Sequence, residues 1–383
     1  MRNEETYLLQ LLKDLDINYT DSILNSDKTI FENDHLISLD LKRSNIRKIP
    51  AESLVHFPYL RWISLKFNEI STISPQLFST NYRLETVILD HNKLTSLPPD
   101  LFKPLSKLRK ISIRFNELEQ LPEELFQFNT NLEFIDFTYN YLTELPNNIF
   151  QNNLKLNWLD LKRNRITSIH PALLRKLQQL QYLNLQVNVL THLEETCFAK
   201  LNKLAVIHLQ HNRIKKLPHN LFYSNINLLA IYLNYNLITS ISENLFNRLE
   251  LLREVNLDYN KIKNIAEYTF NNNPMLERIS LIQNSLNELP PKLFYNLPNL
   301  MFVKLSENKL KKLPDQLFNN NTNLKQLYLD NNQLSSLPTT IYQNTRLQQL
   351  ILDGNNLDTN HPENLMNNKA IMLFFNTMRL RHP

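Results

Sequence analysis

The sequence predicts an α/β solenoid, in which one short unit is repeated and stacked, and three observations support this fold class. The pattern L-x-x-L-x-L-x-x-N-x-L recurs from Leu36 to Leu357. In each copy the apolar fourth and sixth positions alternate with polar ones, which is typical of a half-buried strand. One such unit cannot bury its apolar side alone, so the units must stack to form a continuous core.

The repeat keeps one register through fourteen copies. Thirteen copies begin 24 residues apart, and the fourteenth begins one residue early, at Leu347. Asparagine fills the ninth position of every copy except the first, which has Ser44. We expect these asparagines to be buried and to bond backbone groups that the loops leave unpaired. The first thirteen copies begin at Leu36, Leu60, Leu84, Leu108, Leu132, Leu156, Leu180, Leu204, Leu228, Leu252, Leu276, Leu300 and Leu324.

These residues resemble the leucine-rich-repeat family, specifically its 24-residue type. The stretches LTSLPPDLFKPLSK at 94–107 and LKKLPDQLFNNNTN at 310–323 also follow the second half of that family's repeat. The resemblance covers residues 36–357. It implies a curved, right-handed solenoid of horseshoe shape, with a parallel β-sheet on the concave face and short helical or irregular turns on the convex face.

The second half of each copy carries a further apolar column. Phenylalanine occupies the nineteenth position in ten copies, which predicts a stacked aromatic column on the convex side. We expect Leu54, Leu174 and Tyr342 to fill gaps in that column. The ten residues are Phe78, Phe102, Phe126, Phe150, Phe198, Phe222, Phe246, Phe270, Phe294 and Phe318.

The two ends must shield the first and last faces of the core. Residues 1–35 contain an apolar helical stripe, so we expect an N-terminal helical cap there. In residues 358–383 apolar residues follow Pro362 at helical spacing, and we expect a C-terminal helical cap. The prediction is one continuous solenoid domain, residues 36–357, between two caps. The two stripes consist of Tyr7, Leu8, Leu11, Leu12 and Leu15, and of Met366, Ala370, Leu373 and Phe374.

The composition excludes several classes of enzyme and of site. Gly354 is the only glycine, so the chain cannot build the glycine-rich loops that bind phosphates and dinucleotides, or a nucleophile elbow. Cys197 is the only cysteine, which excludes an internal disulfide and a thiolate zinc site, and we expect it to be a buried core residue. The net charge of +5 is dispersed and does not indicate a nucleic-acid partner. No apolar stretch is long enough to span a membrane, and the first residues do not read as a signal peptide.

No pattern indicates catalysis, a metal ion or a cofactor. Two histidines share one strand, but no third ligand is predicted near them. Two carboxylate pairs are predicted to be solvated side chains on an open surface, without the cleft that shifts a catalytic pKa. Residues 1–35 and 358–383, outside the repeats, are too short for a catalytic domain, so we expect a non-enzymatic protein. These candidates are His208 with His211, Glu133 with Asp136, and Asp90 with Glu85.

The concave surface is the remaining candidate site, and the third, fifth, seventh and eighth positions are predicted to lie there. Large aromatic residues at the third and fifth positions are typical anchors of protein interfaces. Basic residues at the seventh and eighth positions gather in the first six copies, which favours an acidic partner surface, although solubility alone is an alternative explanation. Aromatic residues at the eighth position are explained by the family's repeat. The predicted partner-binding residues are Trp62, Lys66, Arg114, Phe134, Trp158, Lys162, Tyr182 and Tyr232.

We therefore predict a monomer that binds another protein on its concave face. The scarcity of glycine, the abundance of asparagine and the lack of cysteine caps and of a signal peptide resemble the leucine-rich-repeat effectors that intracellular bacteria such as Legionella deliver into host cells. The resemblance implies a location in the cytosol, or in a host cell after secretion without a conventional signal peptide. Two alternatives remain: an extracellular receptor or adhesion ectodomain of the Toll-like receptor kind, and a substrate-recognition subunit of a ubiquitin-ligase-type assembly.

Overall fold

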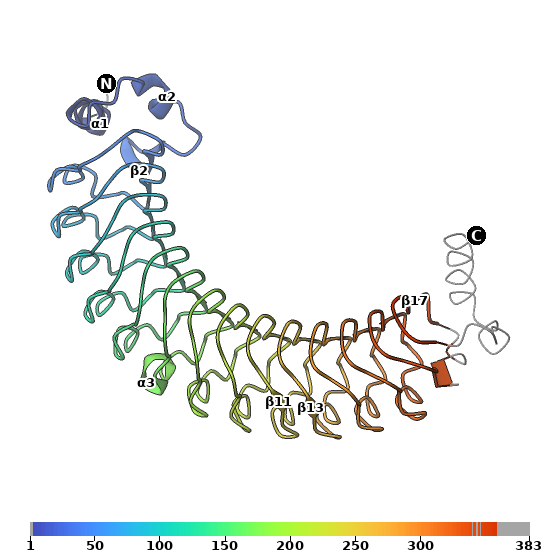
Figure 1. Cartoon of the computed structure of the whole chain (residues 1–383). Coiled ribbons are helices and arrows are strands. Elements are labelled where there is room, and N and C mark those ends of the chain that lie inside the picture. Colours follow the sequence, from blue (N-terminus) through green and yellow to red (C-terminus); the bar gives the residue numbers. More distant parts are fainter. Residues whose placement is uncertain (1–2, 339, 342–343, 345, 358–383) are drawn as a thin grey trace, which may run out of the picture. The chain divides into compact units, whose positions relative to one another are not determined.

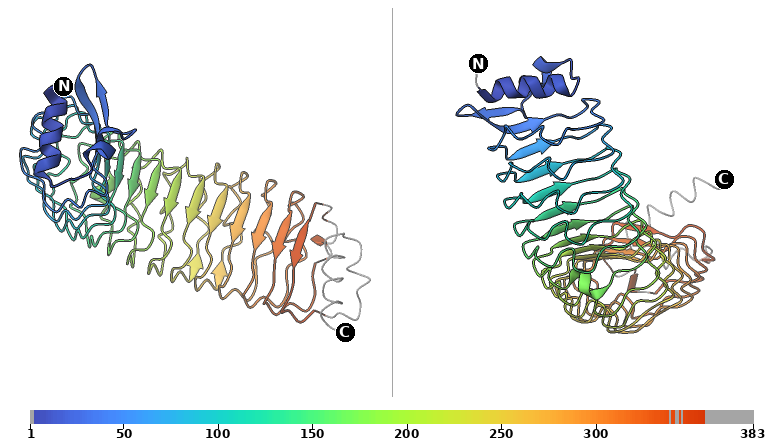
Figure 2. Two further views of the ribbon diagram at one scale, coloured as in Figure 1. Left: turned by 90° about the horizontal axis from the view of Figure 1, so that it is seen from above. Right: turned by 90° about the vertical axis from the view of Figure 1, so that its left-hand side faces the viewer.

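The computed structural model describes residues 3–338, 340–341, 344 and 346–357, and the chain divides into two compact units, Met1–Val189 and Leu190–Pro383. In each unit, every turn of a solenoid contributes one short strand to a parallel sheet (Figures 1 and 2). The predicted fold class is therefore confirmed. Tyr342 and the predicted C-terminal helix lie outside the described residues.

Unit 1, residues 1–189, begins with two helices and continues with strands that pair in register. Strands β2 to β8 are parallel neighbours, and equivalent positions of successive repeats face each other, as Trp62 does Thr86. The convex side consists of turns, with one four-residue helix, α3. The elements are α1 (Asn3–Asp14), α2 (Thr20–Leu24), β1 (Ile30–Glu32), β2 (His35–Asp40), β3 (Trp62–Ser64), β4 (Thr86–Ile88), β5 (Lys110–Ser112), β6 (Phe134–Asp136), β7 (Trp158–Asp160), α3 (Pro171–Leu174) and β8 (Tyr182–Asn184).

Unit 2, residues 190–383, repeats the same parallel arrangement and adds a second small sheet. Its main sheet has the order β9-β10-β12-β14-β15-β16-β17. The short strands β11 and β13 pair with each other away from it, as the two yellow arrows in the left view of Figure 2 show. The elements are β9 (Val206–His208), β10 (Ala230–Tyr232), β11 (Ser240–Ile241), β12 (Glu254–Asn256), β13 (Asn264–Ile265), β14 (Arg278–Ser280), β15 (Phe302–Lys304), β16 (Gln326–Tyr328) and β17 (Gln349–Ile351).

The helix α1 covers the first strand of the sheet, as the apolar stripe predicted, but the stripe is narrower than expected. Leu8, Leu11 and Leu12 are buried, whereas Tyr7 is 44% exposed and stacks on His56 with ring centroids 4.0 Å apart. Tyr7 was therefore wrongly placed on the buried stripe. Tyrosine is suited to this exposed site because its hydroxyl is polar and its ring packs on that of His56. A further strand that the sequence did not predict, β1, pairs antiparallel to β2.

The buried carboxylate of Glu4 fastens α1 to the sheet. Its Oε2 accepts a hydrogen bond from the backbone N–H of Leu36 at 2.5 Å, and its Oε1 lies 2.8 Å from Nδ1 of His35. Both contacts involve residues of β2, the first repeat strand. The carboxylate therefore ties α1 to the start of β2 through one backbone and one side-chain partner.

The ninth-position asparagines are hydrogen-bonded to the backbone, and all are buried, as predicted, except the half-buried Asn355 of the last copy. Asn92 is representative: its Nδ2 donates to the carbonyls of Leu65 and Leu89 at 2.9 and 3.0 Å, and its Oδ1 accepts from the backbone N–H of Ile70 at 3.0 Å. Each such amide ties two successive repeats together. The column therefore acts as structure, because it satisfies backbone groups that would otherwise be buried without partners.

The predicted phenylalanine column is also present in both units. Phe78, Phe102 and Phe126 stack successively with centroids 6.3 and 6.0 Å apart in unit 1, and Phe246 stacks on Phe270 at 5.5 Å in unit 2. Leu54 and Leu174 are buried in the gaps. Cys197 is 2% exposed, and burial raises the pKa of its thiol to about 12, so the expectation of a core residue is confirmed.

A second asparagine column, at the twenty-second position, was not predicted. In Asn273, Nδ2 donates to the carbonyls of Phe246 and Leu249 at 2.9 Å each, while Oδ1 is buried without a hydrogen-bond partner in the described part of the chain. The other five members share this arrangement. The column consists of Asn81, Asn129, Asn153, Asn225, Asn273 and Asn321.

The eighth position of each repeat adopts the left-handed backbone region. Its φ angle lies between 50° and 58° for the thirteen non-glycine residues, which include the β-branched Val187 and several aromatics. Only Gly354 is a glycine there, with φ of 70°. Non-glycine residues in this region are strained, and bulky ones most of all. The same backbone requirement thus recurs in each repeat, and only the last repeat meets it with glycine.

Candidate functional site

The sheet of unit 1 presents one face to solvent, which we call the sheet face. Because its strands pair in register, side chains at the third, fifth and seventh positions form three rows across it. Trp62 and Lys110 belong to the third-position row, Ser64 and Asp136 to the fifth, and Arg114 to the seventh. Residues far apart in sequence therefore lie side by side on one surface.

A depression of about 530 Å³ lies in the sheet face, and we call it the basic hollow. The fifth-position residues Ser64, Ile88 and Ser112 form its floor on β3, β4 and β5, between longer side chains of the third and seventh rows. It is lined by Lys28, Asp40, Lys42, Arg43, Trp62, Ser64, Lys66, Phe67, Ile88, Asp90, Lys110, Ser112, Arg114, Phe134 and Asp136.

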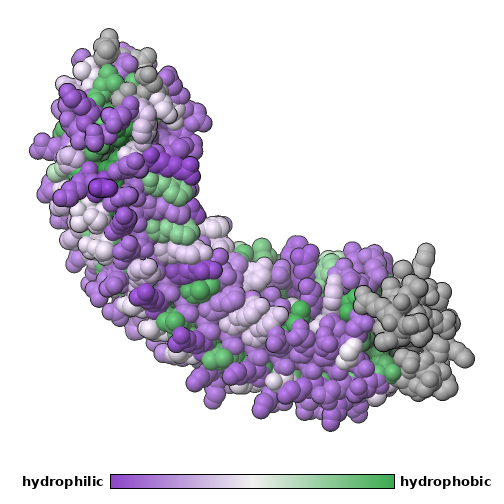
Figure 3. Space-filling view, turned by 45° about the horizontal axis from the view of Figure 1, so that its top comes forward, coloured by the Kyte–Doolittle hydropathy of each residue, from purple (hydrophilic) through white to green (hydrophobic). Residues whose placement is uncertain are grey.

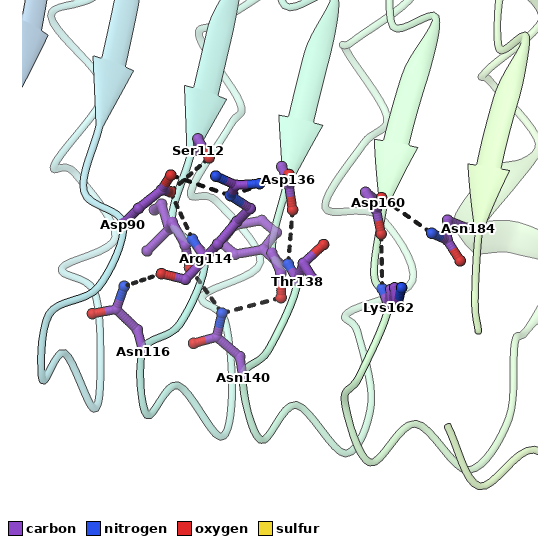
Figure 4. Close-up of polar contacts among 12 residues, drawn as sticks. Asp90, Ser112, Arg114, Asn116, Asp136, Thr138, Asn140, Asp160, Lys162 and Asn184 are labelled. Carbon is purple, nitrogen blue, oxygen red and sulfur yellow. Dashed lines mark hydrogen bonds and ion pairs between the residues drawn. The ribbon is translucent and has the colours of Figure 1, made fainter. Parts of the chain in front are cut away.

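The carboxylates of the basic hollow are buried and already bonded. Asp90 Oδ1 accepts hydrogen bonds from the Ser112 hydroxyl at 2.6 Å and from the backbone N–H of Arg114 at 2.9 Å (Figure 4). Arg114 Nε lies 3.1 Å from Asp90 Oδ2 and 3.7 Å from Asp136 Oδ2. Asp40 pairs with Lys42 at 3.2 Å. The three carboxylates are therefore part of the structure of the sheet face.

The expectation that Asp90 and Asp136 are solvated is wrong. Their side chains are 3% and 9% exposed, because they lie beneath the longer seventh-position side chain of Arg114. The pKa of Asp136 is raised to about 6, mainly by burial and also by the neighbouring carboxylate of Asp160, while hydrogen bonds from Thr138 and the charge of Arg114 oppose the shift. Asp136 thus changes charge near pH 6, yet no nucleophile or metal ligand set accompanies it.

Three cations of the basic hollow lie over aromatic rings. Arg43 and Lys66 lie 4.9 and 4.8 Å from the centroid of the Phe67 ring, and Lys110 lies 4.6 Å from that of Phe134. Ring faces attract cations electrostatically without neutralising their charge. A partner approaching the hollow would therefore meet positive charge first.

Two aromatic stacks border the hollow. In the third-position row, Trp158 stacks on Phe134 at 5.7 Å and on Tyr182 at 3.6 Å between ring centroids. In the eighth-position row, Phe67, His91, Phe115 and Tyr139 stack in turn at 4.1 to 4.2 Å. Burial lowers the pKa of the His91 imidazole, as do the charges of Lys66 and Arg114, against the attraction of Asp90. The imidazole in that stack is therefore held toward its neutral form.

The predicted site residues fall into three groups. Trp62, Lys66, Arg114 and Phe134 line the basic hollow together. Trp158 and Tyr182 form the stack beside it, and Lys162, on the same sheet face, donates its backbone N–H to Asp160 at 3.0 Å. Tyr232 belongs to unit 2, where it stacks on His208 with centroids 4.6 Å apart. Burial raises the pKa of the Tyr232 phenol, and the negative charge of the Glu254 carboxylate raises it as well.

Sequence reasoning missed Lys110 and the floor of the hollow. Lys110 occupies a third position, where only aromatic residues were considered as anchors. The signal that could have revealed the floor is the run Ser64, Ile88 and Ser112 at the fifth position of three successive copies, none of which carries a carboxylate or amide there. Elsewhere in unit 1 that position carries Asp or Asn.

Neither a metal site nor a membrane-spanning helix is found among the described residues. No group of three or more His, Cys, Asp or Glu side chains is placed there to hold a metal ion. His211, one of the two candidate histidines, stacks on Tyr235 with centroids 4.2 Å apart. None of the helices described is both long and apolar enough to cross a bilayer. On the face seen in Figure 3, hydrophilic residues predominate and hydrophobic ones form small separate patches.

Solved structures similar to the chain include repeat proteins in complexes. The LRIM1/APL1C complex matches with a TM-score of 0.75 and 26% identity, over 89% of this chain and 62% of that one. A leucine-rich-repeat protein of Leptospira interrogans matches with a TM-score of 0.65 and 25% identity, over 91% and 95%. The Toll–Spätzle complex of Drosophila matches with a TM-score of 0.65 and 23% identity, over 82% of this chain but only 45% of that one. The last therefore shows the fold alone.

Family models match most of the chain. The BspA type leucine rich repeat region, of six copies, matches residues 239–367. No curated protein matches the chain significantly. The leucine rich repeat model matches residues 10–70, 58–118, 106–166, 154–214 and 202–262. With these matches and the stacked repeats of both units, the chain belongs to the leucine-rich-repeat family.

Proposed function

We propose that the chain is a non-enzymatic protein-binding module, and that the sheet face of unit 1 binds an acidic surface of a partner protein. The observation that carries this proposal is the layering of charge in the basic hollow. Its carboxylates are bonded at the bottom, whereas its cations lie above them beside Trp62 and Phe134. Aromatic side chains next to basic ones are the composition of protein-interface hot spots.

The comparisons support a binding role in general terms. Toll is found in complex with Spätzle, and LRIM1 in complex with APL1C. The fold of this chain is similar to both structures, and its repeats place it in the leucine-rich-repeat family. We extend that role to the present chain as a proposal, with Trp62, Lys66 and Phe134 as direct contacts, Arg114 as their support, and Trp158, Lys162 and Tyr182 continuing the surface.

Capture of partners from a host-cell lysate tests this proposal if parent and variant baits are compared quantitatively. Trp62→Ala should weaken binding of the captured partner by about 2 kcal/mol or more, because it removes an aromatic anchor. Tyr82→Ala is the matched control, since Tyr82 is an aromatic residue 52% exposed in unit 1 that does not line the hollow. A partner that binds the Trp62 variant normally and loses binding to Tyr232→Ala would place the site in unit 2.

The cellular setting is a separate proposal: a bacterial effector that acts on a host protein, in the cytosol or in a host cell after secretion. Its support is the composition and the similarity to a Leptospira interrogans protein of nearly equal length. A translocation reporter fused to the full chain should give a signal inside host cells. Detection only at the outer surface of the producing cell would contradict this and favour the ectodomain alternative. Capture of ubiquitin-ligase subunits would favour the other alternative, a substrate-recognition subunit of a ubiquitin-ligase-type assembly.

A further inference from the structure

The basic hollow contains more positive charge than its own carboxylates neutralise. Six basic residues and three aspartates line it. The three aspartates are bonded by two of the bases: Asp40 by Lys42, and both Asp90 and Asp136 by Arg114. Within the described part of the chain, the other four have no carboxylate within ion-pair distance. These four are Lys28, Arg43, Lys66 and Lys110.

The depth of the charges decides what a ligand meets. The side chains of Asp40 and Asp90 are each 3% exposed, whereas Lys28, Arg43 and Lys110 are exposed and Lys66 is half-buried. The cations stand above the carboxylates, so the field at the mouth of the hollow is positive. Three of the four cations also lie over the rings of Phe67 and Phe134, which restricts their motion and prepares them for a ligand.

The floor of the basic hollow adds an apolar surface that the ligand must cover. Ile88 lies between the hydroxyl-bearing Ser64 and Ser112, with Trp62 beside it. Ile88 is half-buried, so part of its apolar surface is open to the hollow. A ligand that is anionic throughout would leave this surface in contact with water. A ligand with one apolar side chain between anionic ones would cover it.

We propose that the basic hollow binds a short acidic segment of the partner protein, with an apolar side chain on Ile88 and Trp62 and flanking carboxylates at Lys66 and Lys110. This inference rests on the proposed function and specifies its ligand. Arg114 is a positioning residue here, because Asp90 and Asp136 already occupy its guanidinium. The volume of about 530 Å³ has room for several side chains, so the ligand is a segment rather than a single group.

A peptide titration tests the proposal with the full chain. The probe is a five-residue peptide, blocked at both ends, with a central leucine and two glutamates on each side. The Lys66→Gln/Lys110→Gln double variant should bind it at least tenfold more weakly than the parent at low salt, as measured by calorimetry. Lys107→Gln/Lys155→Gln is the matched control, since both lysines are exposed in unit 1 and neither lines the hollow. Thermal melts of all variants confirm that the fold is retained.

Two companion peptides define the chemistry of the ligand. Replacing the glutamates by glutamines should abolish binding, and replacing the central leucine by glycine should weaken it several-fold. Equal binding of the glutamine peptide, or an unchanged affinity of the lysine double variant, would overturn the proposal. If the peptide fails to bind while Trp62→Ala still releases the captured partner, the ligand chemistry is wrong and the protein-binding function stands.

Discussion

Asp136 on β6 lies directly opposite Asp160 on β7, so two carboxylates stand side by side on neighbouring parallel strands. Asp160 is bonded by the backbone N–H of Lys162 and by Nδ2 of Asn184, at 3.0 and 3.1 Å. Asp136 accepts hydrogen bonds from Thr138 and has a more distant guanidinium, that of Arg114. Burial is the main cause that raises the pKa of Asp136 to about 6, and the facing carboxylate of Asp160 contributes to the rise.

The first prediction is that Asp136→Asn stabilises the protein at neutral pH. A carboxyl group whose pKa is raised by folding favours the folded state at low pH, and this contribution is lost as the pH rises from about 4 through about 6. Above pH 6 the buried charge costs on the order of 1–3 kcal/mol, which asparagine avoids while still accepting the Thr138 hydrogen bond. Denaturant unfolding should show a clearly larger gain for the variant at pH 7.5 than at pH 5, where about half of the cost has developed.

Asp315→Asn is the control for this measurement, because Asp315 is an exposed aspartate in another repeat. It should leave unfolding unchanged at both pH values. An Asp136→Asn variant less stable than the parent at pH 7.5 would show that the ion pair with Arg114 outweighs the cost of burial.

The second prediction concerns the left-handed backbone at the eighth position. Val187 has a φ of 55°, which is strained for a β-branched residue. Asparagine tolerates this region, and Asn331 occupies the equivalent position of a later repeat with the same φ of 55°. Val187→Asn should therefore raise the free energy of unfolding by roughly 0.5–1 kcal/mol, measured by denaturant unfolding. Val206→Asn, a change of the same kind within strand β9, should lower it, and the reverse order of the two variants would contradict the strain argument.

The third prediction separates the two asparagine columns within one repeat. Asn260 makes four hydrogen bonds, three through Nδ2 and one through Oδ1, so Asn260→Leu should cost about 3 kcal/mol or more by leaving buried backbone groups unbonded. Asn273 has a buried Oδ1 without a partner, and the equivalent position of the preceding and following repeats holds Leu249 and Leu297. Asn273→Leu should cost less than about 1 kcal/mol. Similar losses for both variants, measured by urea unfolding, would refute the distinction.

The repeat made the fold predictable because each repeat position is set by local packing. The asparagine and phenylalanine columns recur because the same hydrogen-bonding or apolar environment recurs at their position in each repeat. Cys197 occupies an apolar position of the same kind. Tyr7 was wrongly assigned to the buried stripe, and strand β1 was not predicted, because both lie before the first repeat, where no such recurrence exists. The second asparagine column is less regular, because the twenty-second position holds asparagine in only six copies, among them Asn81 and Asn129, and leucine in several others.

The candidate site was only partly predictable, for a physical reason. The row to which each side chain belongs follows from its repeat position, and Trp62, Lys66, Arg114 and Phe134 do lie together. How deeply each side chain is buried does not follow from its repeat position, because burial depends on the lengths of the neighbouring side chains. Asp136 is buried because Arg114 reaches across from the next strand, and that contact involves two different repeats. The count of charges at the seventh and eighth positions therefore treated Arg114 as an available cation, although it pairs with two aspartates. It also left out Lys110, which is at a third position.

The fourth prediction joins the titration of Asp136 to ligand binding. The charged groups facing it are Arg114, two residues after β5, and Asp160 on β7. When the pH falls below about 6, Asp136 takes up a proton, Arg114 loses one of its two carboxylates, and the basic hollow becomes more positive. The glutamate peptide keeps its own charge above about pH 5.5, because unperturbed glutamate titrates near 4.3.

Peptide affinity should therefore rise about threefold or more between pH 7.5 and pH 5.5, since one added unit of charge changes the interaction by about 1 kcal/mol at this range. Asp136→Asn should bind with the higher affinity at both pH values and show a flat profile, measured by calorimetry at constant ionic strength. Asp315→Asn should retain the slope of the parent. A slope that persists in Asp136→Asn would assign the pH dependence to another group, with His91 beside the hollow as the next to be replaced.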